Sequence, residues 1–231
     1  MINNYTTQQS AVVHIRPHQV LSIGDGFDDR INFFMPQAQG QGSLSTIEAI
    51  ILIKLMRIVN AAYIFEFGTY RGLTTRILLE NLPPHDVDGE RIFTLDLPAI
   101  DGINFQGSDL EVAKQSINFQ RKYLSSSNKK DVKQILQDCL TLDESLYSNK
   151  FQLIFIDGNH EVNYVRSDTE KSFVMLSDSP SCIAWHDYGN PEFPELTNYI
   201  DGLAKNIDIF HIEGTMLAFH LKGKEIPSRN Y

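Results

Sequence analysis

Acidic and imidazole side chains follow two apolar runs of the sequence, and these residue types could do chemistry. They are Asp157 and His160 after the run 151–156, and His186 and Asp187 after the run 181–185. Asp157 and Asp187 could bind a hard divalent cation such as Mg²⁺, which would acidify a hydroxyl and orient it. Alternatively, His160 or His186 could remove the hydroxyl proton as a general base.

A glycine loop precedes these clusters in the chain. The segment Tyr63–Glu80 reads as a short apolar strand, a tight loop and an amphipathic helix. Gly68 and Gly72 let the chain turn sharply and let a ligand approach the backbone. The helix start at about Gly72 would direct free amides at that ligand.

The spacing of this loop indicates which ligand to expect. Its pattern is E-x-G-x-x-x-G, with Tyr70 at the place of the middle glycine of the dinucleotide pattern G-x-G-x-x-G. A dinucleotide is therefore disfavoured. A cationic ligand without phosphate fits better, because Glu66 would stabilise a sulfonium and loop amides would bind a carboxylate. S-adenosylmethionine has both groups.

The stretch from Glu66 to Gly72 resembles the first motif of class I S-adenosylmethionine-dependent methyltransferases. The clusters 157–160 and 186–188 resemble the signature of one branch, the methyltransferase 24 type, which includes macrocin-type sugar O-methyltransferases and cephalosporin-hydroxylase-like proteins. The resemblance runs from about Ser45 to Leu221. It implies an α/β, Rossmann-like, seven-stranded, mostly parallel sheet with a terminal antiparallel hairpin strand, and methylation of a small-molecule hydroxyl on a sugar or secondary metabolite.

The cofactor site is expected to combine loop and strand-end residues. They are Glu66, Gly68, Thr69, Tyr70, Gly72, Thr74, Asp96, Asp138 and Asp157. Asp96 ends an apolar run about 24 residues after Gly72, close to the offset at which an acidic residue meets ribose hydroxyls. The resemblance implies that Asp138 contacts the adenine amino group.

The resemblance leaves the cation and the base open. Metal-using relatives carry a third acidic or amide ligand directly after the second strand's aspartate, where this chain has Tyr188. Asn159 or Asn190 could complete the shell, and Mg²⁺ also tolerates several waters. Some sugar-modifying relatives have a base aspartate where Asn159 stands, which would move that role to a histidine. The candidate catalytic residues are His160, His186 and Asp187, and the candidate metal ligands are Asp157 and Asp187.

Two parts of the chain are predicted, an N-terminal arm over 1–44 and a methyltransferase domain over 45–231. The apolar run 49–62 is interrupted by Lys54 and Arg57 and is too short to span a membrane. It is predicted to be a buried helix that begins with a capping box of Ser45 and Glu48. A polar insertion over 98–128, with a helix over about 108–124, is expected near the substrate as part of a lid.

Composition limits the partners. The formal net charge is −9, without a large lysine or arginine cluster, so no nucleic acid is expected. The two cysteines support no disulfide framework. The N-terminus has no basic region followed by an apolar core, so a cytoplasmic protein is expected. The expected partner is the small-molecule acceptor, and a homo-oligomer is expected by analogy.

Two other functions stay open on the sequence alone. An NAD(P)-dependent oxidoreductase or nucleotide-sugar enzyme is disfavoured by Tyr70 in the loop and by the absence of a Tyr-x-x-x-Lys pair. A non-catalytic protein would bind the cofactor through Glu66 and Asp96 without turning it over.

Overall fold

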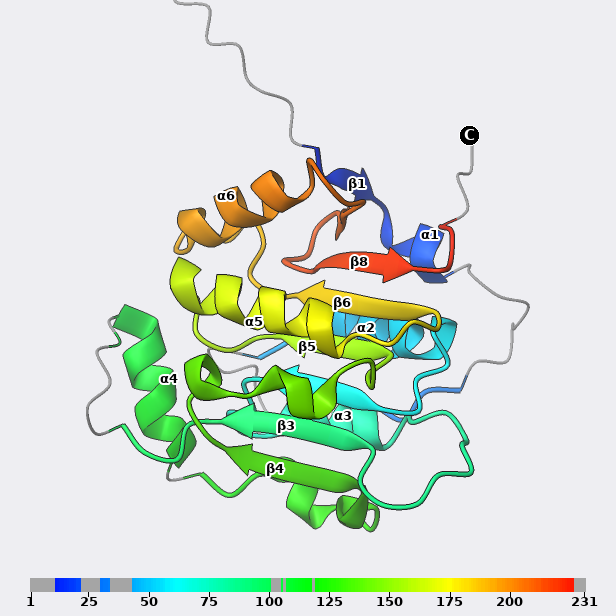
Figure 1. Ribbon diagram of the computed structural model, residues 1–231, viewed down its shortest axis with the longest axis vertical. Coiled ribbons are helices and arrows are strands. Elements are labelled where there is room, and N and C mark those ends of the chain that lie inside the picture. Colours follow the sequence, from blue (N-terminus) through cyan, green and yellow to red (C-terminus); the bar gives the residue numbers. More distant parts are fainter. Residues whose placement is uncertain are drawn as a thin grey trace, which may run out of the picture.

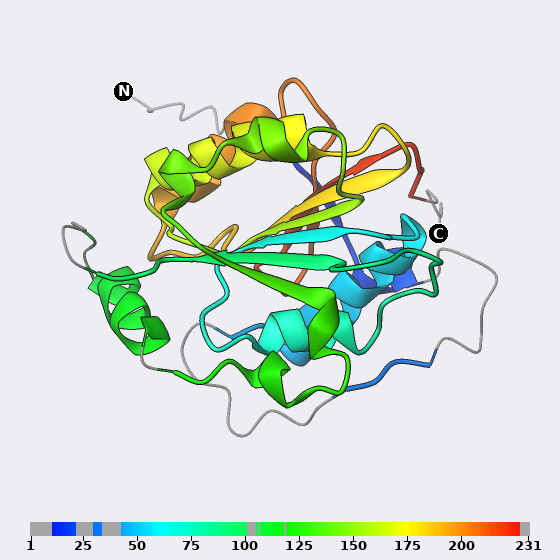
Figure 2. The same cartoon turned by 60° about the horizontal axis from the view of Figure 1, so that its bottom comes forward.

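The computed structural model describes residues 11–21, 30–33, 43–100, 105, 107–117 and 119–226. These residues form three layers, a twisted sheet with helices on both faces (Figures 1 and 2). The strands are β1 (Val13–Ile15), β2 (Ile64–Phe67), β3 (Ile92–Asp96), β4 (Val132–Leu136), β5 (Leu153–Ile156), β6 (Ser181–Trp185), β7 (Phe210–Ile212) and β8 (Ala218–Lys222). The helices are α1 (Pro17–Leu21), α2 (Thr46–Ile58), α3 (Leu73–Leu79), α4 (Gly107–Ile117), α5 (Val162–Met175) and α6 (Pro194–Leu203).

The strand order is β1-β7-β8-β6-β5-β2-β3-β4. Strand β8 runs antiparallel to both β6 and β7, and the other pairs are parallel. This confirms the predicted Rossmann-like sheet with an antiparallel strand near its end, with one difference, because the sheet has eight strands rather than seven. The additional strand is β1, which pairs with β7 and comes from the predicted arm. The boundary at residue 44 stays a prediction, and residues 1–10, 22–29 and 34–42 of the arm lie outside the described part.

Helix α2 shows how local sequence and packing agree. Its capping box is present, because the Ser45 hydroxyl accepts from the Glu48 amide at 3.3 Å and the Glu48 carboxylate accepts from the Ser45 amide at 2.7 Å. Ile51, Leu52 and Leu55 are fully buried against the sheet. The predicted buried helix is confirmed, and no described helix is long and apolar enough to cross a bilayer.

The polar ends of the parallel strands meet at one edge of the sheet. The chain leaves β2 toward β3 on one side, whereas β5 lies on the other side of β2, so a crevice forms where the strand order reverses. Strands β5 and β6 are buried along their whole length, which explains their apolar sequences. The helix predicted over 108–124 is shorter, because α4 ends at Ile117 and a separate 3₁₀ helix covers Lys122–Ser125.

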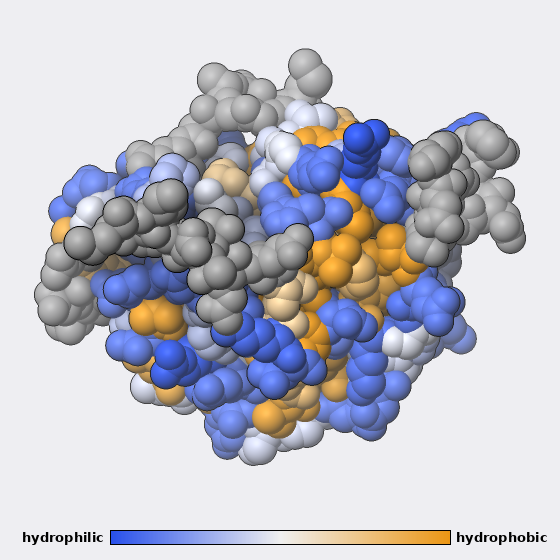
Figure 3. All heavy atoms as spheres, turned by 90° about the horizontal axis from the view of Figure 1, so that it is seen from above, coloured by the Kyte–Doolittle hydropathy of each residue, from blue (hydrophilic) through white to orange (hydrophobic). Residues whose placement is uncertain are grey.

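The edge of the sheet at β1 and α1 exposes apolar side chains. Apolar side chains gather on the face seen in Figure 3. Val13 and Leu21, which belong to these two elements, are 48% and 38% exposed. Exposed apolar patches are typical of contact surfaces, and the homo-oligomer remains a prediction.

Candidate active site

The glycine loop is held tightly against the end of β5. Gly68 has φ +92°, and a Cβ on it would lie 2.1 Å from the Asp157 carbonyl oxygen. Gly72, with φ +67°, precedes α3, and a Cβ there would meet the Tyr123 ring at 2.8 Å. Both positions therefore require glycine, because of their backbone conformation and because of the close approach of neighbouring atoms.

Glu66 lies behind the loop, with 1% of its surface exposed. Its carboxyl group accepts hydrogen bonds from the Thr75 hydroxyl at 2.5 Å and the Thr94 hydroxyl at 2.6 Å. Burial raises the pKa of Glu66 to about 8, although the two hydroxyls act to lower it. At neutral pH this group is therefore mainly protonated, and its hydrogen bonds stabilise the frame of the loop.

Glu66→Gln is expected to stabilise the protein increasingly as the pH rises from 5 to 8. Between the unfolded pKa of 4.5 and the folded pKa of about 8, native Glu66 binds a proton that the unfolded chain has released, so wild-type stability from this group falls over that range. The glutamine side chain of the variant has no proton to lose and can still accept from both threonines. Thermal unfolding at each pH measures the effect, at about 2–4 °C per kcal/mol for a chain of this size.

The control is Glu111→Gln, at an exposed position of α4. That variant should follow the wild-type pH profile. A constant difference in Tm between Glu66→Gln and wild type at pH 5 and pH 8 would contradict the assignment of a raised pKa to Glu66.

A cavity with about 610 Å³ of empty space, part of it open to solvent, lies over the ends of β2, β3, β4 and β5. Five predicted cofactor residues line it, Gly68, Tyr70, Asp96, Asp138 and Asp157. The structure thus brings residues from four strand ends into one site.

The other predicted cofactor residues support the loop. The Thr69 hydroxyl is buried 2.7 Å from the Thr94 hydroxyl and accepts from the Gln134 amide at 2.9 Å. Gly72 forms the turn before α3, and Thr74 is half-buried in α3. With Glu66, these residues are not among those that line the cavity.

Asp96 is the most densely hydrogen-bonded residue of the cavity wall. Its Oδ2 accepts from the Tyr70 amide at 3.0 Å, the Ser116 hydroxyl at 2.5 Å and the Arg121 guanidinium at 2.9 Å. Its Oδ1 accepts from the Leu97 amide at 2.9 Å. Oδ1 therefore has more free acceptor capacity than Oδ2. Asp138 has a more local contact, because its Oδ1 accepts a hydrogen bond from the Leu140 amide at 2.9 Å.

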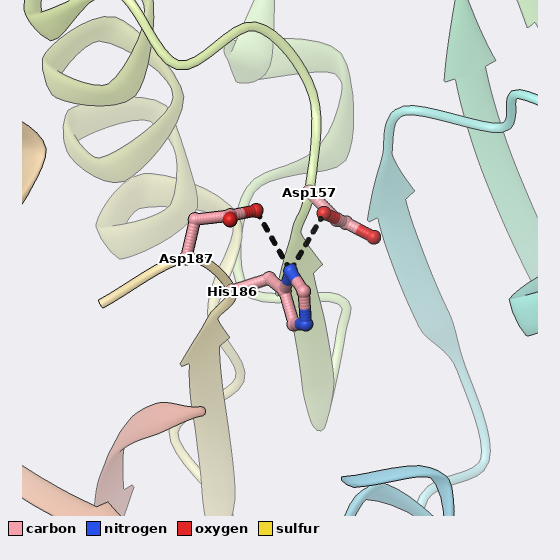
Figure 4. Close-up of side chains that lie close together, drawn as sticks. All are labelled: Asp157, His186 and Asp187. Carbon is pink, nitrogen blue, oxygen red and sulfur yellow. Dashed lines mark hydrogen bonds and ion pairs between the residues drawn. The ribbon is translucent and has the colours of Figure 1, made fainter. Parts of the chain in front are cut away.

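Asp157, which lines the cavity, converges with His186 and Asp187, and the three side chains come from the ends of β5 and β6 (Figure 4). The His186 Nδ1 lies 2.8 Å from Asp187 Oδ2 and 3.4 Å from Asp157 Oδ1. One ligand atom from each residue lies within 4.8 Å of the other two, which suits a metal ion. The two strand ends therefore come together, and His186 joins the pair of aspartates that the sequence singles out.

His160 joins this cluster from the start of α5. Its Nδ1 lies 2.6 Å from Asp109 Oδ1 and its Nε2 lies 2.9 Å from Asp187 Oδ2. Its ring stacks on Phe193 with the centroids 4.2 Å apart. Burial acts to lower the pKa of His160, but Asp109 and Asp187 outweigh it and raise the pKa to about 10.

For His186 and Asp187, as for His160, neighbouring charges outweigh the effect of burial on the pKa. Burial opposes protonation of His186, yet Asp157, Asp187 and Glu48 raise its pKa well above the usual value. Burial also acts to raise the pKa of Asp187, but the two imidazoles hold it well below its usual range. Four carboxyl groups therefore surround two imidazole rings, and acidic groups outnumber basic ones.

Two members of this cluster are not predicted from the sequence. Glu48 lies in α2, with its Oε2 3.5 Å from His186 Nε2. The capping box identifies Glu48, but only the fold shows that this carboxylate also faces the end of β6. Asp109 lies in the helix predicted as a lid, and its position 51 residues before His160 gives no local signal.

The place after Asp187 is occupied by a structural residue. Tyr188 is buried, and its hydroxyl donates to Asp201 Oδ1 at 2.8 Å. Asn190 instead contacts the cluster, because its amide donates to Asp187 Oδ1 at 2.5 Å. Asn159 caps the Glu161 amide at 2.7 Å. Of the two suggested substitutes for a third ligand, Asn190 is therefore the one that contacts Asp187.

The sheet order, the glycine loop and a cavity over the strand ends define a Rossmann-like protein that binds a nucleoside-containing cofactor. A family model described as a methyltransferase domain matches residues 65–188, which is more than half of the 231 residues. The chain belongs to this family, and it is a class I S-adenosylmethionine-dependent methyltransferase of the methyltransferase 24 type.

Solved structures share the fold. The methyltransferase PaMTH1 of Podospora anserina is 18% identical, with a TM-score of 0.52 over 80% of this chain and 81% of that protein. The O-methyltransferase TomG of Streptomyces achromogenes is 17% identical, with a TM-score of 0.50 over 78% and 80%. A putative caffeoyl-CoA O-methyltransferase from Staphylococcus aureus is 16% identical, with a TM-score of 0.54 over 78% and 85%. A comparison with curated proteins found no match.

Proposed function

We propose that this protein transfers the methyl group of S-adenosylmethionine to a hydroxyl of a small molecule, with a divalent cation at Asp157, His186 and Asp187. One observation carries the proposal. Asp157 belongs both to the cavity lined by Gly68 and Asp96 and to the acidic cluster at β6. The methyl donor and the hydroxyl would therefore meet beside this residue.

The cofactor would extend along the strand ends. Asp96, at the expected offset from the glycine loop, would accept from the ribose hydroxyls through its less occupied Oδ1. Gly68 lines the cavity at the end of β2, where the methionine moiety would lie. These two contacts direct the sulfonium toward Asp157.

The positions of the imidazole nitrogens favour the cation over a histidine base. Both ring nitrogens of His160 face carboxylates, Asp109 and Asp187. His186 likewise faces Asp187 with Nδ1 and Glu48 with Nε2. Each ring nitrogen therefore already faces a carboxylate, which leaves none free for an incoming hydroxyl proton.

The residues present fit a cation. Two carboxylates and one imidazole are a donor set suited to Mg²⁺ or Mn²⁺ with waters completing the shell. When bound, the ion would acidify the acceptor hydroxyl and orient it. Glu48 would position His186 by holding Nε2, so that Nδ1 faces the ligand site.

The acceptor class draws support from similar folds. TomG is described as an O-methyltransferase of tomaymycin synthesis, and the Staphylococcus protein as a putative caffeoyl-CoA O-methyltransferase. Both descriptions name an O-methyltransferase. We therefore propose phenolic, catecholic and sugar hydroxyls as the acceptors to test.

The test is a screen with S-adenosylmethionine carrying a deuterated methyl group, with each acceptor class, with and without Mg²⁺ or Mn²⁺. Mass spectrometry should find the labelled methyl group on an acceptor oxygen, in greater amount with the cation. A label found on nitrogen or carbon would contradict O-methylation. Cofactor binding without any product across the panel would support the non-catalytic alternative.

A further inference from the structure

Helix α4 covers part of the cavity with little apolar packing of its own. Four of its residues, Asp109, Val112, Ala113 and Ser116, line the cavity, and only Ala113 and Ser116 are buried. The helix stands at one end of the molecule, beyond the carboxyl ends of β3 and β4 (Figures 1 and 2). Packing of an apolar face usually holds a helix in place, so polar contacts supply much of the attachment of α4.

The first turn of α4 is joined to the ends of β5 and β6. Asp109 accepts a hydrogen bond from the His160 backbone amide at 3.2 Å, and its Oδ1 lies 2.6 Å from His160 Nδ1. The His160 Nε2 in turn lies 2.9 Å from Asp187 Oδ2. Beside these contacts, the Ser108 hydroxyl donates to Glu192 Oε1 at 2.7 Å. The first turn is therefore attached to the strand ends that carry the proposed cation site.

The last turns of α4 are joined to the glycine loop and to β3. The Tyr70 hydroxyl donates to the Gln115 side chain at 2.8 Å, and the Ser116 hydroxyl donates to Asp96 Oδ2 at 2.5 Å. Asp96 is the proposed ribose ligand, whereas Asp109 and Ser108 are not proposed to bind the cofactor. The first turn can therefore separate from the strand ends while the proposed cofactor ligands stay in place.

We propose that Asp109 is a positioning residue whose contact with His160 holds the first turn of α4 closed over the cavity, and that exchange of the cofactor requires this turn to open. The inference rests on the proposed function, because it takes the cavity as the cofactor site. The Asp109 contact is the stronger of the two, since a largely buried carboxylate accepts twice from one residue, whereas the bond between Ser108 and Glu192 is exposed. His160 thereby has a role that does not require it to be a base.

Surface plasmon resonance with S-adenosylhomocysteine tests the proposal. Asp109→Ala should raise the dissociation rate constant by about 10- to 100-fold, because two hydrogen bonds to a charged group are lost. The association rate constant should rise as well, since more of the unliganded protein then has the first turn open. Asp109→Asn keeps one acceptor oxygen and should give intermediate values. The control is Glu111→Gln, which breaks an ion pair with Lys114 within α4 and should behave as wild type.

A cross-link tests the same contact region from the opposite direction. A variant with both Ser108→Cys and Glu192→Cys, joined by a short bis-maleimide, would keep the first turn closed. The native thiols of Cys139 and Cys182 are buried, which protects them from the reagent. The linked protein should bind and release S-adenosylhomocysteine about 10-fold or more slowly than the same variant blocked with N-ethylmaleimide.

The outcomes separate the two proposals. A wild type that does not bind S-adenosylhomocysteine overturns the cofactor assignment, and this inference with it. Binding with wild-type rate constants in Asp109→Ala overturns the role of Asp109 alone. Faster dissociation with slower association does so too, because it indicates a damaged cavity rather than a more open one. If Asp109→Ala gives no cooperative thermal transition, the cross-linked variant decides, and equal exchange rates in its linked and blocked forms overturn the inference.

Discussion

Asp187→Asn is expected to lower kcat by about 10²- to 10⁴-fold, the usual gain from assisted removal of the reacting proton, because the variant loses a carboxylate of the proposed cation site that would acidify the hydroxyl. Asp187 Oδ2 contacts both His160 and His186, so the variant loses the acid that joins the two imidazoles. Asparagine tolerates the left-handed backbone of this residue, with φ +61°. The affinity for S-adenosylhomocysteine should stay close to that of the wild type, because Asp187 does not line the cofactor cavity.

Initial rates with any acceptor that the wild type methylates measure this effect. The matched variant is Asp109→Asn, which removes the other carboxylate beside His160 without touching the predicted ligand set. It should lower kcat less than Asp187→Asn. Equal losses in both variants would indicate that His160, rather than a cation site, is the critical group.

Gly68→Ala is expected to destabilise the fold by about 3 kcal/mol or more, from a left-handed backbone and a steric overlap. The added Cβ would lie 2.1 Å from the Asp157 carbonyl oxygen, which is backbone and cannot rotate away. The end of β2 must then separate from the end of β5. The variant should also lose cofactor binding, because Gly68 and Asp157 both line the cavity.

Gly89 provides the control, because it has a similar φ of +85° and nothing within 4 Å of an added Cβ. Gly89→Ala should destabilise the protein by only about 1–2 kcal/mol, from the backbone conformation alone. Urea unfolding of the wild type and both variants measures the loss in free energy of unfolding for each. Similar losses in the two variants would contradict the close approach of the β2 and β5 loops.

Strand and loop positions could be predicted because they depend on local sequence. The apolar run before Asp157 is short and rich in phenylalanine and isoleucine, which favours a buried strand over a helix. The glycines at 68 and 72 mark a turn, because both have a left-handed backbone and closely approaching neighbours. Strand β1 could not be predicted, since its three residues gain their strand character only from pairing with β7. Two of these residues are exposed, so no apolar run marks the strand.

The strand-end residues of the site could be predicted from the sequence, but their contacts with residues of the helices could not. Asp157 and Asp187 follow adjacent parallel strands, so their convergence follows from the sheet. The contacts of Glu48 and Asp109 with the two histidines depend on tertiary packing, which brings α2 and α4 to the same strand ends. The sequence alone predicts that Glu66 faces the ligand as a carboxylate, but two threonines and the sheet enclose it.

The most direct test of the central claim is isothermal titration of S-adenosylhomocysteine and of Mn²⁺ into the wild type and into Asp157→Asn, with the surface variant Asp178→Asn as a control. The wild type should bind the cofactor product with a Kd of about 1–100 μM, or roughly −8 to −5 kcal/mol, and should also bind Mn²⁺. Asp157→Asn should lose the Mn²⁺ heat, and Asp178→Asn should retain it. The absence of cofactor binding by the wild type at millimolar concentration would contradict the account, and Mn²⁺ binding that survives Asp157→Asn would contradict the cation site.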